Sequence, residues 1–256
     1  MSTQQEWSFI YGIVRLQRPR IAIEVGVAYG GMAQSIYRAM NDNYNDTGIE
    51  SWYTGFDLWD THGIHSQFQQ MGSMEEVDQK LKDIGKRHAL VKIDTQKDQE
   101  NFRQQLTQRF TLGIDFAFID GCHSYEGIKN DFFNIWSHMN PNGIVAFHDT
   151  AVIDGCREFI ADLRIHNNGS YDVSDFPYGT NQRNCGITLI TKPGFGNVKI
   201  DEICGSPSVP EDIYAKEEPK ITSFQDKYLL NPILELLLLR NKQTMLQVVR
   251  ARRFVN

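Results

Sequence analysis

Short apolar segments alternate with helix-length segments from residue 21 to residue 147, and this alternation restricts the fold more than any other feature. The apolar segments lie at residues 21–25, 52–58, 89–93, 114–119 and 144–147. Helical patterns of apolar residues separate them, at residues 32–40, 74–86, 98–110 and 125–139. Strands that alternate with helices form a parallel sheet, and right-handed crossovers place the helices on both of its faces. The sequence therefore predicts a doubly wound α/β fold.

Further segments extend this core on either side. Apolar residues at helical spacing from Gln4 to Gln17 predict a lead-in helix. The turn sequence Pro141-Asn142-Gly143 is expected to lead into the fifth strand. Beyond that strand we expect a helix at 155–163 and two strands, at 171–174 and 186–191, that form an antiparallel edge hairpin. The predicted sheet has about seven strands and is mostly parallel.

The composition changes after residue 192. Residues 193–227 are rich in Pro, Gly, Ser and acidic side chains, which predicts an irregular linker. Residues 228–256 are rich in leucine and have a basic end, which predicts a C-terminal helix. Such a helix can pack on the domain, join two copies into a homo-oligomer, or lie peripherally on an anionic membrane. The chain is thus divided into a domain at 1–192, the linker and the terminal helix.

Charge and cysteine usage exclude several classes of protein. The net charge of −6 disfavours a nucleic acid as the partner, because phosphate binding requires a basic surplus. The four cysteines are scattered with no C-x-x-C pair, as in a protein whose thiols stay reduced. The first residues contain no basic segment that leads into an apolar one, and no apolar run is long enough to cross a bilayer. We therefore expect a cytoplasmic protein.

The turn after the first strand, with the spacing G-x-x-x-G-G, is the first candidate binding site, because ligands of open α/β sheets bind at the carboxyl ends of the strands. Gly26 permits a sharp turn, and Gly30 and Gly31 permit close approach of a ligand at a helix start, although such glycines also serve packing alone. The turn lacks the G-x-G of the dinucleotide fingerprint. Burial of Glu24 is costly, so this residue is predicted to organise the turn or to meet a ligand ammonium group.

Two acidic residues at the ends of the next strands extend this candidate site. Asp57 ends the second strand, where a carboxylate can accept hydrogen bonds from both hydroxyls of a ribose. Asp94 ends the third strand, where it can flank an adenine. Either residue can also be an ordinary turn aspartate. Together with the glycine turn, Asp57 favours a ligand that carries an adenosine.

A second cluster is expected at the ends of the fourth and fifth strands. Asp120 and Asp149 follow these strands, and adjacent strands lie ~4.8 Å apart, so their carboxylates can converge on a hard cation such as Mg²⁺. His123 lies close to Asp120 in sequence, where it can act as a general base at neutral pH. The sequence therefore predicts acid–base chemistry at this end of the sheet.

A longer pattern resembles a known family. It runs from Phe118-Ile119-Asp120-Gly121-Cys122-His123-Ser124-Tyr125-Glu126 through Asp131 and Trp136 to Pro141-Asn142-Gly143-Ile144-Val145-Ala146-Phe147-His148-Asp149. It resembles class I methyltransferases related to macrolide sugar O-methyltransferases and cephalosporin-hydroxylase-like proteins, over roughly residues 21–192. The resemblance implies a Rossmann-like fold and S-adenosylmethionine as cofactor, with candidate contacts at Glu24, Gly26, Gly30, Gly31, Asp57, Asp94 and Asp120. For several members it also implies a divalent metal.

One position departs from the pattern of the metal-using relatives. They often carry Glu before the second aspartate, whereas this chain has His148. Imidazole suits Zn, Fe, Ni or Mn better than Mg²⁺. The candidate metal ligands are therefore Asp120, Asp149 and His148, with a softer metal. The alternative is a site without metal, in which His148 is a second base or a donor to the substrate.

The sequence as a whole predicts an S-adenosylmethionine-dependent O-methyltransferase that acts on a hydroxyl of a sugar, glycan or small-molecule natural product. Asp120, His123 and His148 are its candidate catalytic residues. A loop with Asp60, His62 and His65, and the segment 176–181, are candidates for the acceptor side, whereas Asp131, Cys122, Tyr125 and Trp136 are expected to be structural or inert. Two alternatives are a nicotinamide-dependent oxidoreductase and a non-catalytic nucleoside-binding module of the same fold.

Overall fold

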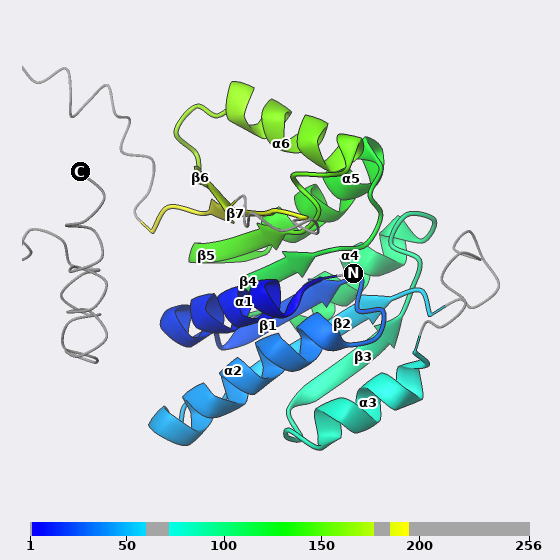
Figure 1. Ribbon diagram of the computed structural model, residues 1–256, viewed down its shortest axis with the longest axis vertical. Helices are drawn as coiled ribbons and strands as arrows, with labels where there is room; N and C mark the ends of the chain where they lie inside the picture. The colour runs from blue at the N-terminus through cyan, green and yellow to red at the C-terminus, as the bar shows by residue number, and fades with distance from the viewer. Residues whose placement is uncertain (1, 60–71, 177–184, 195–256) are drawn as a thin grey trace, which may run out of the picture. The chain divides into compact units, whose positions relative to one another are not determined.

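A computed structural model describes residues 2–59, 72–176 and 185–194. The chain divides into two units, Met1–Ile200 and Asp201–Asn256, and the described residues all belong to the first. Their central element is a seven-stranded sheet with the strand order β3-β2-β1-β4-β5-β7-β6 (Figure 1). This arrangement confirms the predicted Rossmann-like sheet.

The predicted strands and helices of the described residues are all present. The strands are β1 (Ile21–Val25), β2 (Trp52–Asp57), β3 (His88–Lys92), β4 (Ile114–Ile119), β5 (Met139–Phe147), β6 (Asp172–Phe176) and β7 (Ile187–Thr191). The helices are α1 (Gln4–Gln17), α2 (Gly31–Thr47), α3 (Met74–Lys82), α4 (Gln99–Arg109), α5 (Tyr125–Trp136) and α6 (Asp154–Ile165). β1 to β5 pair in parallel, and β7 is antiparallel to both β5 and β6, which confirms the edge hairpin.

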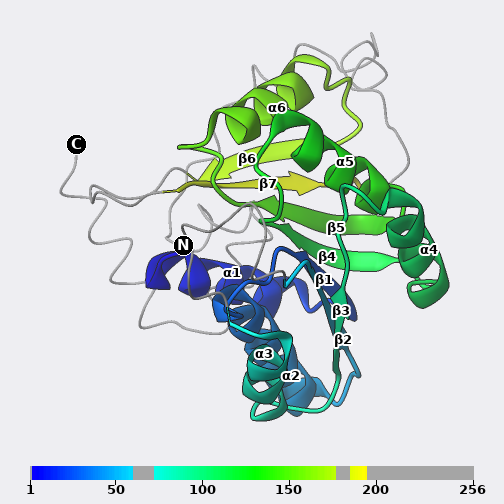
Figure 2. The same cartoon turned by 90° about the vertical axis from the view of Figure 1, so that its right-hand side faces the viewer.

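Helices cover the sheet on both faces (Figure 2). One core joins the sheet to α4, α5 and α6, and the other joins it to α1, α2 and α3. Successive strand residues point to opposite faces, so Ile23 and Val25 belong to the first core and Ala22 to the second. β1, β4 and β7 are largely apolar because both of their faces are buried, whereas the edge strand β6 is polar and partly exposed.

Helix α2 continues beyond its predicted end although its last residues are polar. The side-chain amide of Asn43 donates to the carbonyl of Val14 at 3.0 Å, and its Oδ1 accepts from Arg15 at 2.7 Å. Both partners lie on α1. Gly48 then ends the helix in the left-handed conformation, with φ of 71°. Contacts to α1 thus keep a polar segment helical where sequence periodicity alone gives no signal.

The expected turn at Pro141-Asn142-Gly143 is wrong, because these residues lie inside β5. The pairing of β4 with β5 shifts register between Ile114 and Phe116, and Asn142 has a positive φ of 63°. The N–H of Asn142 donates to the carbonyl of Lys192 at 2.9 Å. Neighbouring chain segments therefore hold this sequence as an irregularity within the strand, which local turn signals do not reveal.

Several predictions lie outside the described residues. They concern the loop with Asp60, His62 and His65, the acceptor-side segment beyond Phe176, the linker from residue 195 on, and the C-terminal helix at 228–256. Among the helices that the structure describes, none has the length and apolar character needed to cross a membrane.

The strand order reverses between β1 and β4, which is where ligands of open α/β sheets bind. The carboxyl ends of the parallel strands meet at one edge of the sheet. Gly26 follows β1, Asp57 ends β2, Asp120 follows β4 and His148 follows β5. The fold therefore places both candidate clusters along the same edge.

Candidate active site

The turn after β1 packs directly against the end of β4. Gly26 has φ of +90°, and its N–H donates to the carbonyl of Phe56 at 2.9 Å. The N–H of Asp120 donates to the carbonyl of Val25 at 2.8 Å. A Cβ on Gly26 would lie 2.1 Å from the carbonyl oxygen of Asp120. No side chain fits there, so glycine at this position allows the turn to contact the segment that carries Asp120.

Asp57 holds the same turn by hydrogen bonds to the backbone. Its Oδ2 accepts from the N–H of Ala28 at 2.8 Å, and its Oδ1 accepts from the N–H of Trp59 at 2.8 Å. Ala28 has a positive φ of 47°, so this bond stabilises an uncommon conformation. Each carboxylate oxygen retains a further lone pair. Asp57 can therefore shape the turn and still accept from a ligand hydroxyl.

Glu24 is buried at 1% exposure within β1. Its Oε2 accepts from the hydroxyl of Tyr53 at 2.5 Å, and its Oε1 has no hydrogen-bond partner among the described residues. Burial raises the pKa of Glu24 well above its ordinary value, and the charges of Asp120 and Asp57 raise it further. An unpartnered oxygen beside other carboxylates fits the predicted contact with a cationic group.

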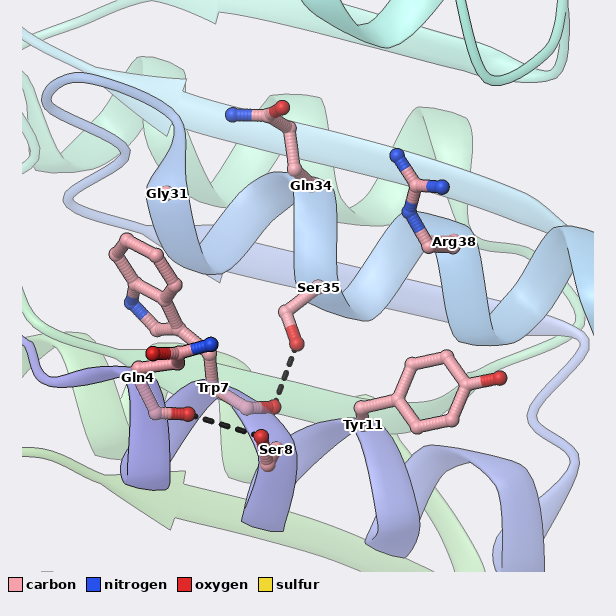
Figure 3. Close-up of a pocket in the computed structure, with 8 residues that line it drawn as sticks. All are labelled: Gln4, Trp7, Ser8, Tyr11, Gly31, Gln34, Ser35 and Arg38. Atoms are coloured by element: carbon pink, nitrogen blue, oxygen red, sulfur yellow. Dashed lines mark hydrogen bonds between the residues drawn. The ribbon is translucent and has the colours of Figure 1, made fainter.

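Gly30 and Gly31 leave room for neighbouring helices. A Cβ on Gly30 would lie 2.9 Å from Val77 of α3, and one on Gly31 would lie 2.7 Å from the indole of Trp7 on α1. Gly31 also borders a groove between α1 and α2, where Ser35 donates to the carbonyl of Trp7 at 2.6 Å (Figure 3). Helix packing thus accounts for both glycines, and their contact with a ligand stays a prediction.

Asp94 closes the turn after β3. Its Oδ1 accepts from the N–H groups of Gln96 and Lys97 at 3.1 and 3.0 Å. Although burial acts in the opposite direction, these backbone hydrogen bonds lower the pKa of Asp94. The residue has a structural role of its own, and its predicted place beside an adenine is not tested by these contacts.

Asp120, His123 and Asp149 converge at the ends of β4 and β5. The Nε2 of His123 lies 3.2 Å from Oδ1 of Asp120 and 3.2 Å from Oδ2 of Asp149. One ligand atom from each residue lies within 4.8 Å of those of the other two. The side chains of His123 and Asp120 are 38% and 22% exposed, so solvent and small molecules reach them. Such a group can orient a base or hold a divalent cation.

His148 joins this cluster from a buried position, with its side chain 1% exposed. Its Nδ1 lies 3.2 Å from Oδ1 of Asp120 and 3.3 Å from Oδ1 of Asp149. Its Nε2 lies 3.4 Å from Oε2 of Glu6, an ion-pair distance rather than a hydrogen bond. The imidazole therefore links the acidic cluster to α1.

Glu6 is the functional candidate that the sequence prediction missed. It is 3% exposed and forms a capping box with Thr3, in which the N–H of Thr3 donates to Oε2 of Glu6 at 2.6 Å. The T-x-x-E spacing is a sequence signal for a helix start, and it places Glu6 in the first turn of α1. No local signal indicates that this side chain also reaches His148, because that contact depends on how α1 packs against the sheet.

The charges of this cluster stabilise one another. Although burial acts in the opposite direction, hydrogen bonds from His123 and His148 hold the pKa of Asp120 at about 2. Burial also opposes the charged form of His148, but its hydrogen bond to Asp120 and its ion-pair contacts with Asp149 and Glu6 raise its pKa to about 12. The hydrogen bond to Asp120 raises the pKa of His123. The surrounding carboxylates therefore favour the cationic form of the buried His148, and the more exposed His123 is the imidazole that a substrate can reach.

The sequence matches the methyltransferase domain family over residues 23–150. The chain belongs to this family. The match starts in β1 and ends just after Asp149, so it spans the glycine turn, Asp57 and the acidic cluster. Family and fold together identify a class I methyltransferase, the S-adenosylmethionine-dependent type, which confirms the resemblance found in the sequence. The nicotinamide-dependent alternative is thereby set aside.

Solved structures share the fold of this methyltransferase at low sequence identity. The O-methyltransferase TomG from Streptomyces achromogenes, involved in tomaymycin synthesis and solved with SAM, is 14% identical with a TM-score of 0.55, and the match covers 76% of this chain and 82% of that chain. An O-methyltransferase from Bacillus cereus, solved with SAH, is 12% identical with a TM-score of 0.54, with 75% and 83% covered. A search of curated proteins finds no match.

Proposed function

We propose that this methyltransferase transfers the methyl group of S-adenosylmethionine to a hydroxyl of a sugar, glycan or small-molecule natural product. The observation that carries the proposal is the convergence of Asp120, His123 and Asp149 beside the turn after β1. A hydroxyl is a weak nucleophile until a base takes its proton. His123 is an accessible imidazole placed between two carboxylates, and it supplies that base. The O-methyltransferases of the same fold are consistent with a hydroxyl acceptor.

The residues of the cluster have different roles in the transfer of one proton. Asp120 and Asp149 accept from Nε2 of His123, so they fix the ring and leave Nδ1 for the acceptor hydroxyl. With the cofactor bound, His123 would take the hydroxyl proton. The acceptor oxygen would form its bond to the methyl carbon as the bond from that carbon to sulfur breaks, which leaves S-adenosylhomocysteine. The two carboxylates stabilise the imidazolium that forms. Because the hydrogen bond to Asp120 raises the pKa of His123, a larger share of its imidazole is protonated at a given pH than for a free histidine, and turnover should rise with pH as the free base forms.

The edge of the sheet fits S-adenosylmethionine in its donor set. Asp57 has lone pairs available for the ribose, Glu24 has an unpartnered buried oxygen for the ammonium group, and Gly26 opens the turn between them. When bound, the cofactor supplies an electrophilic methyl group on a sulfonium. The protein mainly aligns acceptor and methyl group, a contribution that reaches ~7–11 kcal/mol for well-oriented reactants.

The same cluster fits the divalent metal that the resemblance implies for several members. Asp120 and Asp149 offer carboxylate oxygens and His123 a nitrogen, all within 4.8 Å of one another. A metal held there would lower the pKa of an acceptor hydroxyl. His148, the ligand expected from the sequence, faces the same carboxylates through Nδ1. Treatment with a chelator tests this: we expect turnover to fall while cofactor binding stays, and undiminished turnover would contradict metal use.

The function is tested with S-adenosylmethionine carrying a labelled methyl group and a panel of glycosides, polyketide glycosides and phenols. We expect the wild type to methylate a hydroxyl of at least one acceptor, as seen by mass spectrometry, and His123→Ala to bind the cofactor without turnover. A protein that binds the cofactor and methylates nothing in a broad panel would instead support a non-catalytic nucleoside-binding module.

A further inference from the structure

A second group of metal-ligating side chains lies next to the acidic cluster. Glu6, His148 and Cys185 each offer one ligand atom within 4.8 Å of those of the other two. Glu6 lies in the first turn of α1, His148 follows β5, and Cys185 precedes β7. β5 and β7 are antiparallel neighbours, and the N–H of Ala151 donates to the carbonyl of Cys185 at 2.9 Å. The sheet edge and the start of α1 therefore bring the three side chains together.

Two buried polar atoms in this group have no hydrogen-bond partner among the described residues. They are Oε1 of Glu6 and Nε2 of His148, and the latter lies only at ion-pair distance, 3.4 Å, from Oε2 of Glu6. The other polar atoms of these side chains are engaged, since Oε2 of Glu6 accepts from Thr3 and Nδ1 of His148 faces Asp120. Buried polar groups in native proteins are nearly always satisfied, by protein, water or a bound ion. These two atoms therefore indicate a bound species between them.

We propose that Glu6, His148 and Cys185 bind a divalent metal ion of the zinc type, at a site distinct from the Asp120, His123 and Asp149 cluster. Thiolate sulfur, imidazole nitrogen and carboxylate oxygen are all ligands that Zn²⁺ uses, whereas a thiolate does not suit Mg²⁺. Three protein ligands leave a fourth position for water or for an acceptor group.

The surroundings of His148 match those of metal-bound histidines. Such a histidine usually donates its second ring N–H to a carboxylate, which fixes the ring and makes the ligand nitrogen more basic. Asp120 takes this place, with Oδ1 3.2 Å from Nδ1 of His148. A metal on Nε2 would therefore secure α1 to the sheet and hold the histidine that contacts Asp120. The inferred site is thus tied to the geometry of the active site, and it leaves Asp120, His123 and Asp149 free of its own metal.

The properties of Cys185 distinguish this site from other uses of a thiol. Burial, together with a hydrogen bond to Asp149, raises the pKa of Cys185 to about 11, so the free thiol is a poor nucleophile at neutral pH. Metal binding must release the thiol proton and the proton on Nε2 of His148. A buried water would satisfy Glu6 and His148 equally, but it would not need the sulfur. The thiolate is therefore the diagnostic ligand.

The test uses the full-length protein, freed of metal with a chelator and titrated with Co²⁺, because a thiolate bound to Co²⁺ gives a charge-transfer band in the near ultraviolet. We expect one Co²⁺ per chain to give this band and to be displaced by Zn²⁺, whereas any Co²⁺ held by the acidic cluster, which has no thiol, gives no such band. Cys185→Ser should lose the band and bind Co²⁺ at least about tenfold more weakly. Cys122→Ser removes another partly buried thiol and should retain both.

His123→Ala separates the two clusters, since it removes a ligand only from the acidic one and should keep the band. A wild type without the band, or a Cys185→Ser protein with unchanged Co²⁺ affinity, would overturn the inference, and the second result would favour a buried water or the acidic cluster instead. Calorimetric titration of the same samples with S-adenosylmethionine is a separate measurement. Cofactor binding without the thiolate band would exclude the metal site alone, so this result is distinct from a failure of the proposed function.

Discussion

The two ends of the binding edge use their charged residues differently. On the side of the turn after β1, which we propose binds the cofactor and call the cofactor side, Asp57 accepts from the backbone N–H groups of Ala28 and Trp59. On the side of Asp120 and Asp149, which we propose binds the acceptor and call the acceptor side, Asp120 contacts two histidine side chains, and one of these also reaches Glu6 on α1. The first side therefore consists of carboxylates that shape the backbone. The second consists of charged side chains that set each other's protonation.

This difference explains why the two sides respond to different changes. The cofactor side depends on the conformation of one turn, in which Gly26 and Ala28 both have positive φ. The acceptor side holds a carboxyl with a pKa of about 2, Asp120, beside an imidazole with a pKa of about 12, His148. Steric changes should disturb the first side, and charge changes should disturb the second.

The largest effect is expected from the acceptor side. His123→Ala removes the proposed base, and Asp120→Asn removes a carboxylate that orients the ring of this base and stabilises the imidazolium that forms. General acid–base catalysis contributes ~10²–10⁴-fold, so kcat should fall by that amount in each variant. Cofactor affinity should change little, because Asp57 and the turn after β1 are untouched. Steady-state kinetics with the acceptor found in the panel measure this.

His166→Ala provides a matched control, since His166 is an exposed histidine at the end of α6, away from the cluster. Its kcat should equal that of the wild type. If His123→Ala kept more than about a tenth of the wild-type kcat, His123 would not be the base.

The next largest effect is expected where the turn after β1 packs against Asp120. Gly26→Ala would place a Cβ 2.1 Å from the carbonyl oxygen of Asp120 at a φ of +90°. Overpacking and left-handed strain together should lower the free energy of unfolding by about 3–5 kcal/mol. Gly169→Ala has a similar φ of +86° with nothing within 4 Å, and it should cost only about 1–2 kcal/mol. Urea denaturation compares them, and equal losses would show that the contact with β4 is unimportant.

The smallest effect is expected from Asp131 on α5, which lies between the loop after β3 and the loop after β4. It is fully buried, its Oδ1 accepts from Gln96 in the loop after β3 at 3.0 Å, and its Oδ2 lies near Gly121 after β4. Burial raises its pKa from 3.8 to about 7. The folded chain then holds one more proton than the unfolded chain between about pH 4 and pH 7, so stability falls as the pH rises through that window.

Asp131→Asn should remove this pH dependence, because an amide does not titrate. Between about pH 5 and pH 7, the free energy of unfolding should fall more steeply with pH for the wild type than for the variant. The two slopes should differ by at most about 1.4 kcal/mol per pH unit. Denaturation at several pH values measures both slopes. Parallel curves for the two proteins would show that Asp131 titrates at an ordinary pKa.

The fold was largely predictable because its signals are local. β4 was predicted with its observed bounds, since Ile114–Ile119 is apolar except for Asp115 and lies between Gly113 and Asp120. The polar end of α2 was not, because contacts of Asn43 with α1 keep it helical. The segment around Asn142 was predicted as a turn because its irregular conformation within β5 also depends on tertiary contacts. Backbone hydrogen bonds with neighbouring chain segments hold it.

The candidate site was also predictable where its signals are local and not where it depends on tertiary contacts. Asp120, His123 and Asp149 were predicted to meet because strand ends of a parallel sheet share an edge, and the structure brings them together. Glu6 was not found, because its contact with His148 depends on the packing of a helix distant in sequence. Residue pairs joined only by tertiary packing leave no mark in the spacing of a single sequence.

The central claim is that Asp57, at the turn after β1, is required to bind the methyl donor. Calorimetric titration with S-adenosylmethionine tests it on the wild type, Asp57→Ala and Asp115→Ala. Asp115 is a matched control, because it also accepts backbone N–H groups, from Arg20 and Ile21, at the start of β4 rather than at its end. We expect roughly micromolar binding to the wild type and Asp115→Ala, and none to Asp57→Ala. Unchanged binding to Asp57→Ala would contradict the account.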